Sequence, residues 1–293
     1  MTGGVRAAGR RGTNVSGARV GRLADVVFST RVRSARAAAW RLVRHLAAHD
    51  ERGCLARALG RPVDAATVER LFDELRRSPM LTAALDTPAA RCWLRAPADR
   101  PVHELLARLA LRGTGRGRAL FWYGAVRLLR PTAVVETGCF SGWDSTVILE
   151  ALARNGHGHL YSIDLPLRPG QRDPSLPGGG LPRGQSPGFL VPPALRPRWT
   201  LILGDARDEL PSLLRRVGAV ELFFHDSDHR YPHVMWEYTT VWPYLAAGGL
   251  LVSDDISRHT ALWDFAGGVG APVLVPRTNA NIGAVPRCQE RCP

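Results

Sequence analysis

Apolar residues recur along the chain with two different spacings, and each spacing predicts a different kind of element. Between residues 31 and 112 they fall at helical intervals, most clearly over 68–75. The same spacing predicts a helix at 117–129, which Pro131 ends. Beyond it, short apolar runs typical of buried strands alternate with helix-length segments. The predicted strands are 133–136, 160–163, 200–203, 220–224, 249–253 and 273–275, and the predicted helices between them include 144–154, 206–216 and 231–245.

Short strands buried on both faces and separated by helices are typical of a parallel sheet covered by helices. We therefore predict an α/β domain over residues 113–293. A helical region at 31–112 precedes it, and residues 1–30, rich in Gly, Arg and Ser, are expected to form a disordered basic tail. Residues 165–198 interrupt the alternation with many Pro and Gly. A long insertion without regular structure in a compact domain is usually a functional lid or a flexible excursion.

Charge is distributed unevenly along the 293 residues. The net charge is +13, and all 39 basic residues are arginines. The absence of lysine excludes lysine-dependent phosphate loops and Schiff-base chemistry. Residues 1–60 hold twelve arginines and three acidic residues, so most of the excess charge lies there. Such a tail can bind nucleic acid or an anionic surface. Without interleaved aromatic residues a solvated tail is favoured, and an organellar transit peptide is the other alternative.

Cysteine usage and hydropathy point to a cytoplasmic location. The five cysteines are scattered and include no CxxC pair, which disfavours both a zinc site and a disulfide framework. No run approaches the roughly 20 apolar residues that a membrane-spanning helix needs, and the start lacks the apolar core of a secretory signal. We expect a protein with reduced thiols and no membrane contact. The alternative at the tail is that Cys288 and Cys292 form an oxidisable pair, although a loose terminal segment is favoured.

A glycine-rich turn follows the first predicted strand of the sheet. Glu136 ends this strand, and Gly138, Ser141 and Gly142 lie in the turn before the next helix. Glycines let such a turn bend sharply and let a ligand approach the backbone at the carboxyl end of a strand. The dinucleotide fingerprint G-x-G-x-x-G is absent, so NAD(P) binding is disfavoured. An acid before the glycines suits a ligand that has a positive centre.

Two more acids follow the next two predicted strands. Asp164 ends the second, where a carboxylate can accept hydrogen bonds from ribose hydroxyls. Asp205, followed by Ala206, comes after the third, where it can pair with an adenine amino group. Each aspartate alone has a simpler explanation as a turn former or helix cap. Acids at three consecutive strand ends favour one nucleoside site.

The segments VVETGCFSG, SIDLP, GDA, FFHDSDHRY and VSDDI resemble class I S-adenosylmethionine-dependent methyltransferases, from about residue 117 to the end. They are most similar to the group of macrocin-type sugar O-methyltransferases and cephalosporin hydroxylase-like proteins, which is common in bacterial secondary metabolism. The resemblance implies a Rossmann-like fold with a mostly parallel seven-stranded sheet and S-adenosylmethionine as cofactor. It places Glu136, Gly138, Ser141 and Gly142 around the methionine and sugar parts, Asp164 at the ribose, and Asp205 and Ala206 at the adenine.

The same resemblance implies a metal site and a general base. Asp226, after the fourth strand, and Asp254 and Asp255, after the fifth, match the ligands of a divalent cation. Oxygen ligands suit Mg²⁺, with Mn²⁺ or Ca²⁺ as alternatives. Asp226 is also assigned to the cofactor site, and His229 matches the base. Catechol-type relatives have Asn in place of Asp255, so this site is more acidic. The alternatives are that Asp254 and Asp255 cap the next helix and that His229 lies at the surface. Asp228 either faces the cofactor or replaces Asp226 as a metal ligand.

The expected reaction is metal-assisted O-methylation of a small-molecule hydroxyl, in which the cation lowers the pKa of the acceptor oxygen. A sugar or phenolic hydroxyl on a natural product is the acceptor that the resemblance suggests. One alternative is a nucleic-acid methyltransferase, which HDSDHRY disfavours because it replaces the usual Asp/Asn-Pro-Pro-aromatic loop. Another is an accessory protein that binds the cofactor without transferring its methyl group. The sequence leaves open whether the protein is a homo-oligomer.

Overall fold

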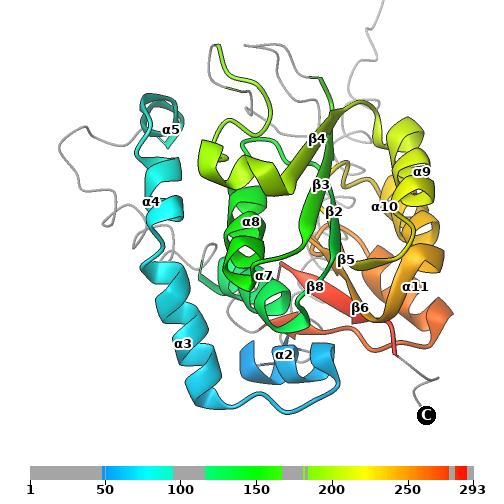
Figure 1. Cartoon of the computed structure of the whole chain (residues 1–293). Coiled ribbons are helices and arrows are strands. Elements are labelled where there is room, and N and C mark those ends of the chain that lie inside the picture. Colours follow the sequence, from blue (N-terminus) through cyan, green and yellow to red (C-terminus); the bar gives the residue numbers. More distant parts are fainter. Residues whose placement is uncertain are drawn as a thin grey trace, which may run out of the picture. The chain divides into compact units, whose positions relative to one another are not determined.

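A six-stranded sheet with the order β4-β3-β2-β5-β6-β8 lies at the centre of the part of the chain that the computed structural model describes (Figure 1). Five strands are parallel, and β8 runs antiparallel to β6 at the edge. The predicted α/β class and its mostly parallel sheet are therefore confirmed. The strands are β2 (Ala133–Thr137), β3 (His159–Asp164), β4 (Trp199–Leu203), β5 (Val220–His225), β6 (Leu245–Ser253) and β8 (Gly283–Pro286).

The chain divides into two units, Met1–Val43 and Arg44–Pro293, and all described residues lie in the second. The predicted basic tail of residues 1–30 lies outside the described residues, so it stays a prediction. The same holds for the proposed domain limits near residues 31 and 113. The structure describes residues 48–49, 51–94, 116–166, 181, 184–276 and 281–288.

Helices cover both faces of the sheet (Figure 1). Neighbouring residues of a strand point to opposite faces, so Val134 joins one buried cluster and Val135 the other. This alternation explains why each strand needs helices on both sides. The helices on the first face are α7 (Arg116–Leu129) and α8 (Trp143–Asn155); those on the second are α9 (Ala206–Val217), α10 (Tyr231–Val241) and α11 (Ala261–Val269).

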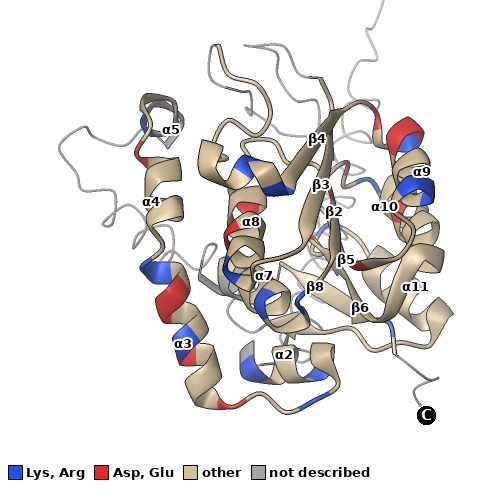
Figure 2. Cartoon of the chain, in the orientation of Figure 1, with Lys and Arg blue, Asp and Glu red and all other residues tan. Residues whose placement is uncertain are grey.

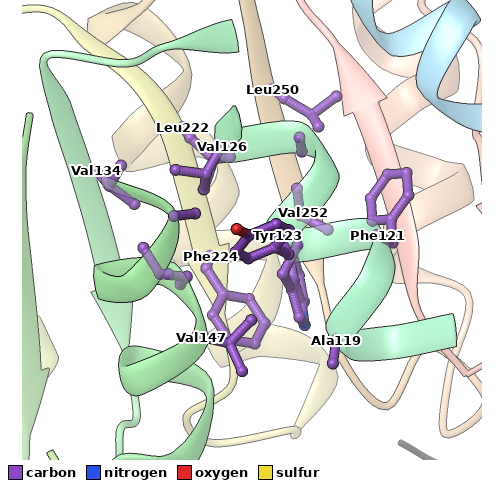
Figure 3. Close-up of a cluster of buried hydrophobic side chains, with 14 of the residues drawn as sticks. Ala119, Phe121, Tyr123, Val126, Val134, Val147, Leu222, Phe224, Leu250 and Val252 are labelled. Carbon is purple, nitrogen blue, oxygen red and sulfur yellow. The ribbon is translucent and has the colours of Figure 1, made fainter. Parts of the chain in front are cut away.

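The first face has a core of large side chains from the sheet, α7 and α8. Figure 3 shows Phe224 of β5 beside Val147 of α8, with Val134 and Tyr123 in the same cluster. The rings of Phe224 and Trp122 have their centroids 3.9 Å apart, and both side chains are fully buried. Burying a large apolar side chain stabilises a fold by about 1.5–3 kcal/mol, so this cluster holds α7 firmly against the sheet.

Short helices precede α7 and pack on the outside of the first layer. Asp64 caps α3 by accepting from Thr67 N, and Ser78 caps α4 by accepting from Leu81 N. Ser78 also donates to the buried Glu150 of α8, which ties α4 to the domain. Helices are thus found where the spacing between residues 31 and 112 predicts them. They are α2 (Glu51–Leu59), α3 (Ala65–Arg76), α4 (Pro79–Leu85) and α5 (Pro88–Leu94).

The sheet differs from the prediction at its last strand. Of the predicted strand 273–275, Leu274 makes a single bridge to Ala284, and β7 (Val275–Pro276) pairs with β1 (Ala48–His49) outside the main sheet. The described sheet therefore has six strands and not seven. The edge strand of the sheet is β8, which is short and ends at Pro286. Such a short strand gives no apolar run that could be recognised in the sequence. The predicted helix 231–245 also ends early, because the chain enters a 3₁₀ turn at Trp242 and then β6.

Charged residues lie mainly on the helices and loops. Figure 2 shows acidic and basic residues along α3 and α9, whereas the strands carry few. Among the described helices, none is long and apolar enough to span a membrane. Cys288 forms a disulfide bond, so the favoured expectation of reduced thiols is wrong at this position and the alternative of an oxidised cysteine in the tail holds. Cys54 and Cys139 are buried cysteines that are not disulfide-bonded.

Candidate functional site

The glycine turn after β2 is closely packed by other parts of the backbone. Gly138 and Gly142 have φ angles of +79° and +82°, a region that favours glycine. A Cβ atom on Gly138 would lie 2.1 Å from the carbonyl oxygen of Asp226, and one on Gly142 would lie 2.7 Å from Cα of Gly188. Protein backbone therefore takes the space that a Cβ atom on either glycine would fill, while the approach of a ligand to this turn stays a prediction. The loop after β5 and the segment around Gly188 occupy this space.

Part of the predicted insertion 165–198 is fixed to this turn. The amide of Gly188 donates to Phe140 O at 2.7 Å, and the amide of Leu190 donates to Ser141 O at 2.9 Å. The segment then forms a 3₁₀ helix, Pro193–Arg198, where the sequence predicts no regular structure. The C-terminal part of the insertion is thus a wall of the turn and not a free excursion; residues 167–180 lie outside the described part of the chain.

Glu136 is completely buried at the end of β2. Its Oε2 accepts hydrogen bonds from Ser145 Oγ at 2.6 Å and from Ser162 Oγ at 2.5 Å, and Trp199 Nε1 in turn donates to Ser162 Oγ. Its Oε1 is buried and has no hydrogen-bond partner within the described part of the protein. Burial raises the pKa of Glu136 to about 8, although the two serine hydrogen bonds oppose this. The carboxyl group is therefore largely protonated at neutral pH.

Asp164, at the end of β3, is bonded to the glycine turn. Its Oδ2 accepts from the amides of Cys139, at 2.9 Å, and Phe140, at 2.5 Å. Burial raises the pKa of Asp164, against the lowering effect of these hydrogen bonds. Because β2 and β3 are paired neighbours, Asp164 and Glu136 lie at the carboxyl ends of adjacent strands. This is the edge where parallel sheets bind ligands.

Asp205 follows β4, the next strand in the sheet. It is exposed, and its side chain caps α9 by accepting from Arg207 N at 2.8 Å. This is the simpler role that the sequence left open for it, and Ala206 is the first residue of the capped helix. The amide of Gly204 donates to Asp164 O at 2.9 Å, so the turns after β3 and β4 lie together. The three acids thus lie at the ends of three adjacent strands.

A second cluster forms where the loops after β5 and β6 meet. His229 Nε2 lies 3.5 Å from Asp226 Oδ1 and 3.6 Å from Asp255 Oδ2. The amide of Asp254 donates to His225 O at 3.0 Å, which joins the two strand ends. Only 7% of the His229 side chain is exposed, so the alternative of a surface histidine is wrong. The structure brings His229 close to Asp226 and Asp255, with Asp254 next in the chain. Among the described residues, no group of three or more His, Cys, Asp or Glu side chains is arranged to hold a metal ion.

His229 is a neutral imidazole at physiological pH. Burial, followed by the charge of His225, lowers the pKa of His229 to about 4, while the charge of Asp255 opposes the shift. Its Nδ1 is buried without a hydrogen-bond partner in the described structure. A neutral ring that faces two carboxylates through Nε2 can accept a proton there, although its low pKa makes it a weak base.

Asp255 has an unusual backbone and a fully engaged side chain. Its φ angle is +50°, a strained value for a residue with a side chain. Asn281 Nδ2 donates to its Oδ1, and Arg258 Nε lies 2.6 Å from its Oδ2. The following helix, α11, begins after Thr260, so the alternative in which Asp255 caps a helix is wrong. Asp228 pairs with Arg230 at the start of α10.

Sequence reasoning missed several polar residues that support these clusters. The most connected is Glu237, which accepts hydrogen bonds from four side chains. One signal was present: His233 and Glu237 are four residues apart in a predicted helix, which places them on one face. The contacts of Ser162, Trp199 and Asn281 join distant segments, so no local pattern indicates them.

Comparisons with known proteins found one family model and several solved structures. A family model described as "Methyltransferase domain" matches residues 135–256, which extend from β2 to the end of β6. No match was found among curated proteins. Solved structures with a similar arrangement include the O-methyltransferase TomG from Streptomyces achromogenes, with 16% identity, covering 72% of this chain and 91% of that chain at a TM-score of 0.46. Another is the methyltransferase PaMTH1 from Podospora anserina, with 15% identity, covering 77% and 97% at 0.45.

The matched segment contains the glycine turn, the acids at the ends of β2, β3 and β4, and the cluster around His229. The strand order places them along one edge of a mostly parallel sheet with an antiparallel edge strand. Residues 135–256 are thus similar to a methyltransferase domain.

Proposed function

We propose that this enzyme transfers the methyl group of S-adenosylmethionine to a hydroxyl oxygen of a small molecule, with a divalent cation, Mg²⁺, at the acceptor side. The observation that carries the proposal is the position of His229 Nε2 between the carboxylates of Asp226 and Asp255. This group lies at the ends of β5 and β6, beside β2, whose end carries Glu136. A sugar or phenolic hydroxyl of a natural product is the proposed acceptor.

The cofactor is proposed to lie along the ends of β2, β3 and β4. Its methionine and sugar parts would contact Glu136, Gly138, Ser141 and Gly142, with Asp164 at the ribose; Asp205 and Ala206 would contact the adenine, and Asp226 would adjoin the site. The buried, unpartnered Oε1 of Glu136 supports this placement, because an unsatisfied polar atom beside a ligand edge suits a polar ligand group. A cationic cofactor nearby would also lower the raised pKa of Glu136.

The proposed cation ligands are Asp226, Asp254 and Asp255. The proposal rests on the kind of donor, because hard divalent cations prefer carboxylate oxygens. Two of the three carboxylates face the same imidazole nitrogen, but the described side chains are not yet arranged as a metal site. Arg258 pairs with Asp255, so a cation would share or replace that contact. When bound, the cation would polarise the acceptor oxygen and lower the pKa of its hydroxyl.

The residues of the chain align the acceptor and remove its proton. When bound, S-adenosylmethionine would supply the methyl group to the acceptor oxygen and leave as S-adenosylhomocysteine, and His229 Nε2 would accept the hydroxyl proton. Holding two reactants in line can lower such a barrier by about 7–11 kcal/mol, so no covalent enzyme intermediate is needed. Because its pKa is about 4, His229 can accept this proton efficiently only from a hydroxyl whose own pKa is lowered.

Two measurements test the proposal. Calorimetric titration with S-adenosylhomocysteine should show binding without metal and weaker binding in Asp164→Asn. The matched control is Glu150→Gln, which changes a buried acid on α8 that is bonded to Ser78 and Arg154. Transfer of labelled methyl groups from S-adenosylmethionine to a panel of sugar and phenolic acceptors should need Mg²⁺, stop with EDTA, and be lost in His229→Gln.

The outcomes separate the alternatives. Binding without transfer to any acceptor would favour an accessory protein. Salt-sensitive binding of oligonucleotides, followed by their methylation, would favour a nucleic-acid methyltransferase. Failure of the wild-type protein to bind S-adenosylhomocysteine at about 1 mM, the limit of useful affinity, would overturn the cofactor site.

A further inference from the structure

A buried carboxylate beneath the His229 cluster joins three elements of the fold. Glu237, on α10, is fully buried, and four side chains donate hydrogen bonds to it. Its Oε2 accepts from Thr137 Oγ1 and His225 Nδ1, both at 2.6 Å. Its Oε1 accepts from Ser227 Oγ at 2.7 Å and His233 Nε2 at 2.9 Å. These donors come from the end of β2, the end of β5, the loop after β5, and α10 itself.

The number and kind of donors show that Glu237 is ionised. Burial alone would raise its pKa, but the His225 and His233 imidazoles and their hydrogen bonds outweigh it and hold the pKa of Glu237 well below its usual value. An ionised carboxylate only accepts hydrogen bonds. Hydrogen bonds to a buried charge are also the strong ones, so the four donors are held in defined positions.

An acceptor-only partner fixes the form of His225. Because Glu237 can donate no proton, His225 Nδ1 carries the hydrogen of this pair. Its Nε2 is buried without a hydrogen-bond partner among the described residues. The His225 ring stands at 88° to the His229 ring, with the centroids 5.5 Å apart. The orientation of His225 therefore sets one wall of the space in which His229 lies.

The same carboxylate fixes the loop that carries His229. Ser227, two residues before His229, donates to Glu237, and the amide of Asp226 donates to Thr137 O at 2.8 Å. Thr137 is itself a donor to Glu237. The loop is therefore attached to the end of β2 both directly and through Glu237, next to the glycine turn.

We propose that Glu237 is a positioning residue that holds the His229 ring between Asp226 and Asp255, by fixing His225 in its Nδ1-protonated form and by tying the loop after β5 to the end of β2. This role rests on the proposed function, in which His229 accepts the proton of the acceptor. Glu237 itself touches neither cofactor nor acceptor in this proposal.

The first test needs no substitution. Long-range ¹⁵N NMR of histidine-labelled wild-type protein shows which nitrogens of each ring carry a proton. We expect a protonated Nδ1 in His225 and a protonated Nε2 in His233. A His225 ring that is protonated on Nε2 alone would overturn the proposal, whatever the variants do.

The second test uses Glu237→Gln with Glu150→Gln as the matched control. A glutamine can donate to His225 Nδ1, so the ring is expected to shift its proton to Nε2. Amide hydrogen exchange at residues 226–230 should then become about tenfold faster or more, since exchange reports local opening. The control, a buried acid in α8, should leave both signals unchanged.

The outcomes of the second test decide between positioning and a purely structural role. Unchanged exchange and an unchanged His225 signal in a folded Glu237→Gln protein would overturn the proposal. Equal acceleration across the whole sheet would do the same, because it would indicate general destabilisation. Cofactor binding distinguishes this proposal from the proposed function. Failure of the wild-type protein to bind S-adenosylhomocysteine would refute the proposed function. The NMR signal of His225 and the amide exchange at residues 226–230 test the role of Glu237 independently of cofactor binding.

Discussion

Ser162 donates a 2.5 Å hydrogen bond from its Oγ to Oε2 of Glu136, the residue opposite it in the paired strands β2 and β3. The same oxygen accepts from Ser145 Oγ at the start of α8. The carboxyl group at the end of β2 is thus held from a neighbouring strand and from the following helix. Its second oxygen is buried and unpartnered, which makes this carboxyl both fixed and chemically unsatisfied.

Glu136→Gln should make stability less dependent on pH. Between the ordinary pKa of 4.5 and the raised value of about 8, the folded state of the wild type binds more protons than the unfolded state. The free energy of unfolding therefore falls as pH rises through this window, by at most about 1.4 kcal/mol per pH unit. Glutamine has no proton to lose, so the slope should decrease. Urea unfolding between about pH 5 and 8.5 measures it, and an identical slope in both proteins would contradict the raised pKa.

His229 should titrate in acid and not near neutrality. Its pKa is lowered from 6.5 to about 4, so the folded state binds fewer protons than the unfolded state between these values. The resulting stability is present above about pH 6.5 and is lost as pH falls towards 4, by at most about 1.4 kcal/mol per unit. NMR titration of the ring protons, with His229→Gln for assignment, gives the pKa directly. A midpoint near 6.5 would show that the ring is solvated.

Gly142→Ala should disturb the wall of the glycine turn. Gly142 and Gly156 flank α8 with φ angles of +82° and +77°, but only at Gly142 would a new Cβ meet a neighbour within 4 Å. Gly156→Ala should cost about 1–2 kcal/mol of backbone strain, and Gly142→Ala about 1–3 kcal/mol more. Affinity for S-adenosylhomocysteine should fall only in Gly142→Ala. Equal losses of stability in the two variants would mean that residues 188–191 move aside at little cost in free energy.

Phe224→Ala should test the core beneath the sheet. Phe224 is fully buried against Trp122, and removing such a ring costs about 3–5 kcal/mol. Leu165→Ala is the exposed control: this side chain is 41% exposed, so its loss should change stability by no more than about 0.5 kcal/mol. Chemical denaturation of both variants provides the comparison. A loss below about 1 kcal/mol in Phe224→Ala would contradict the close ring packing.

The sequence predicted the central strands well because they are buried on both faces. The run from Ala133 to Val135, for example, is apolar over consecutive residues and lies between Pro131 and Gly138. The edge strand β8 escaped because it has four residues, one of them Pro286, and pairs on one side with β6. The short strand β7 was misplaced because local hydropathy cannot tell which distant strand a segment will join.

The candidate site was partly predictable for the same reason. Acids at strand ends are adjacent in sequence to the runs that reveal the strands, so Asp164 and Asp226 were found. Asp205 caps a helix, a role that the same sequence pattern allowed. Glu237 and Ser162 were missed because their partners lie in segments remote in the chain. Whether a polar residue in a helix faces solvent or a buried network depends on tertiary contacts, which no local spacing contains.

The antiparallel strand β8 has a consequence for the order of folding. It pairs with β6 and also packs against α2, so segments near residues 55 and 285 must meet. Contacts between such distant parts of a chain close large loops and form slowly. During synthesis, α2 emerges long before its partner and must wait for nearly the whole domain to be translated. The early folding nucleus should therefore involve nearby pairs such as α7, β2 and α8, with the closure at β8 as the final step.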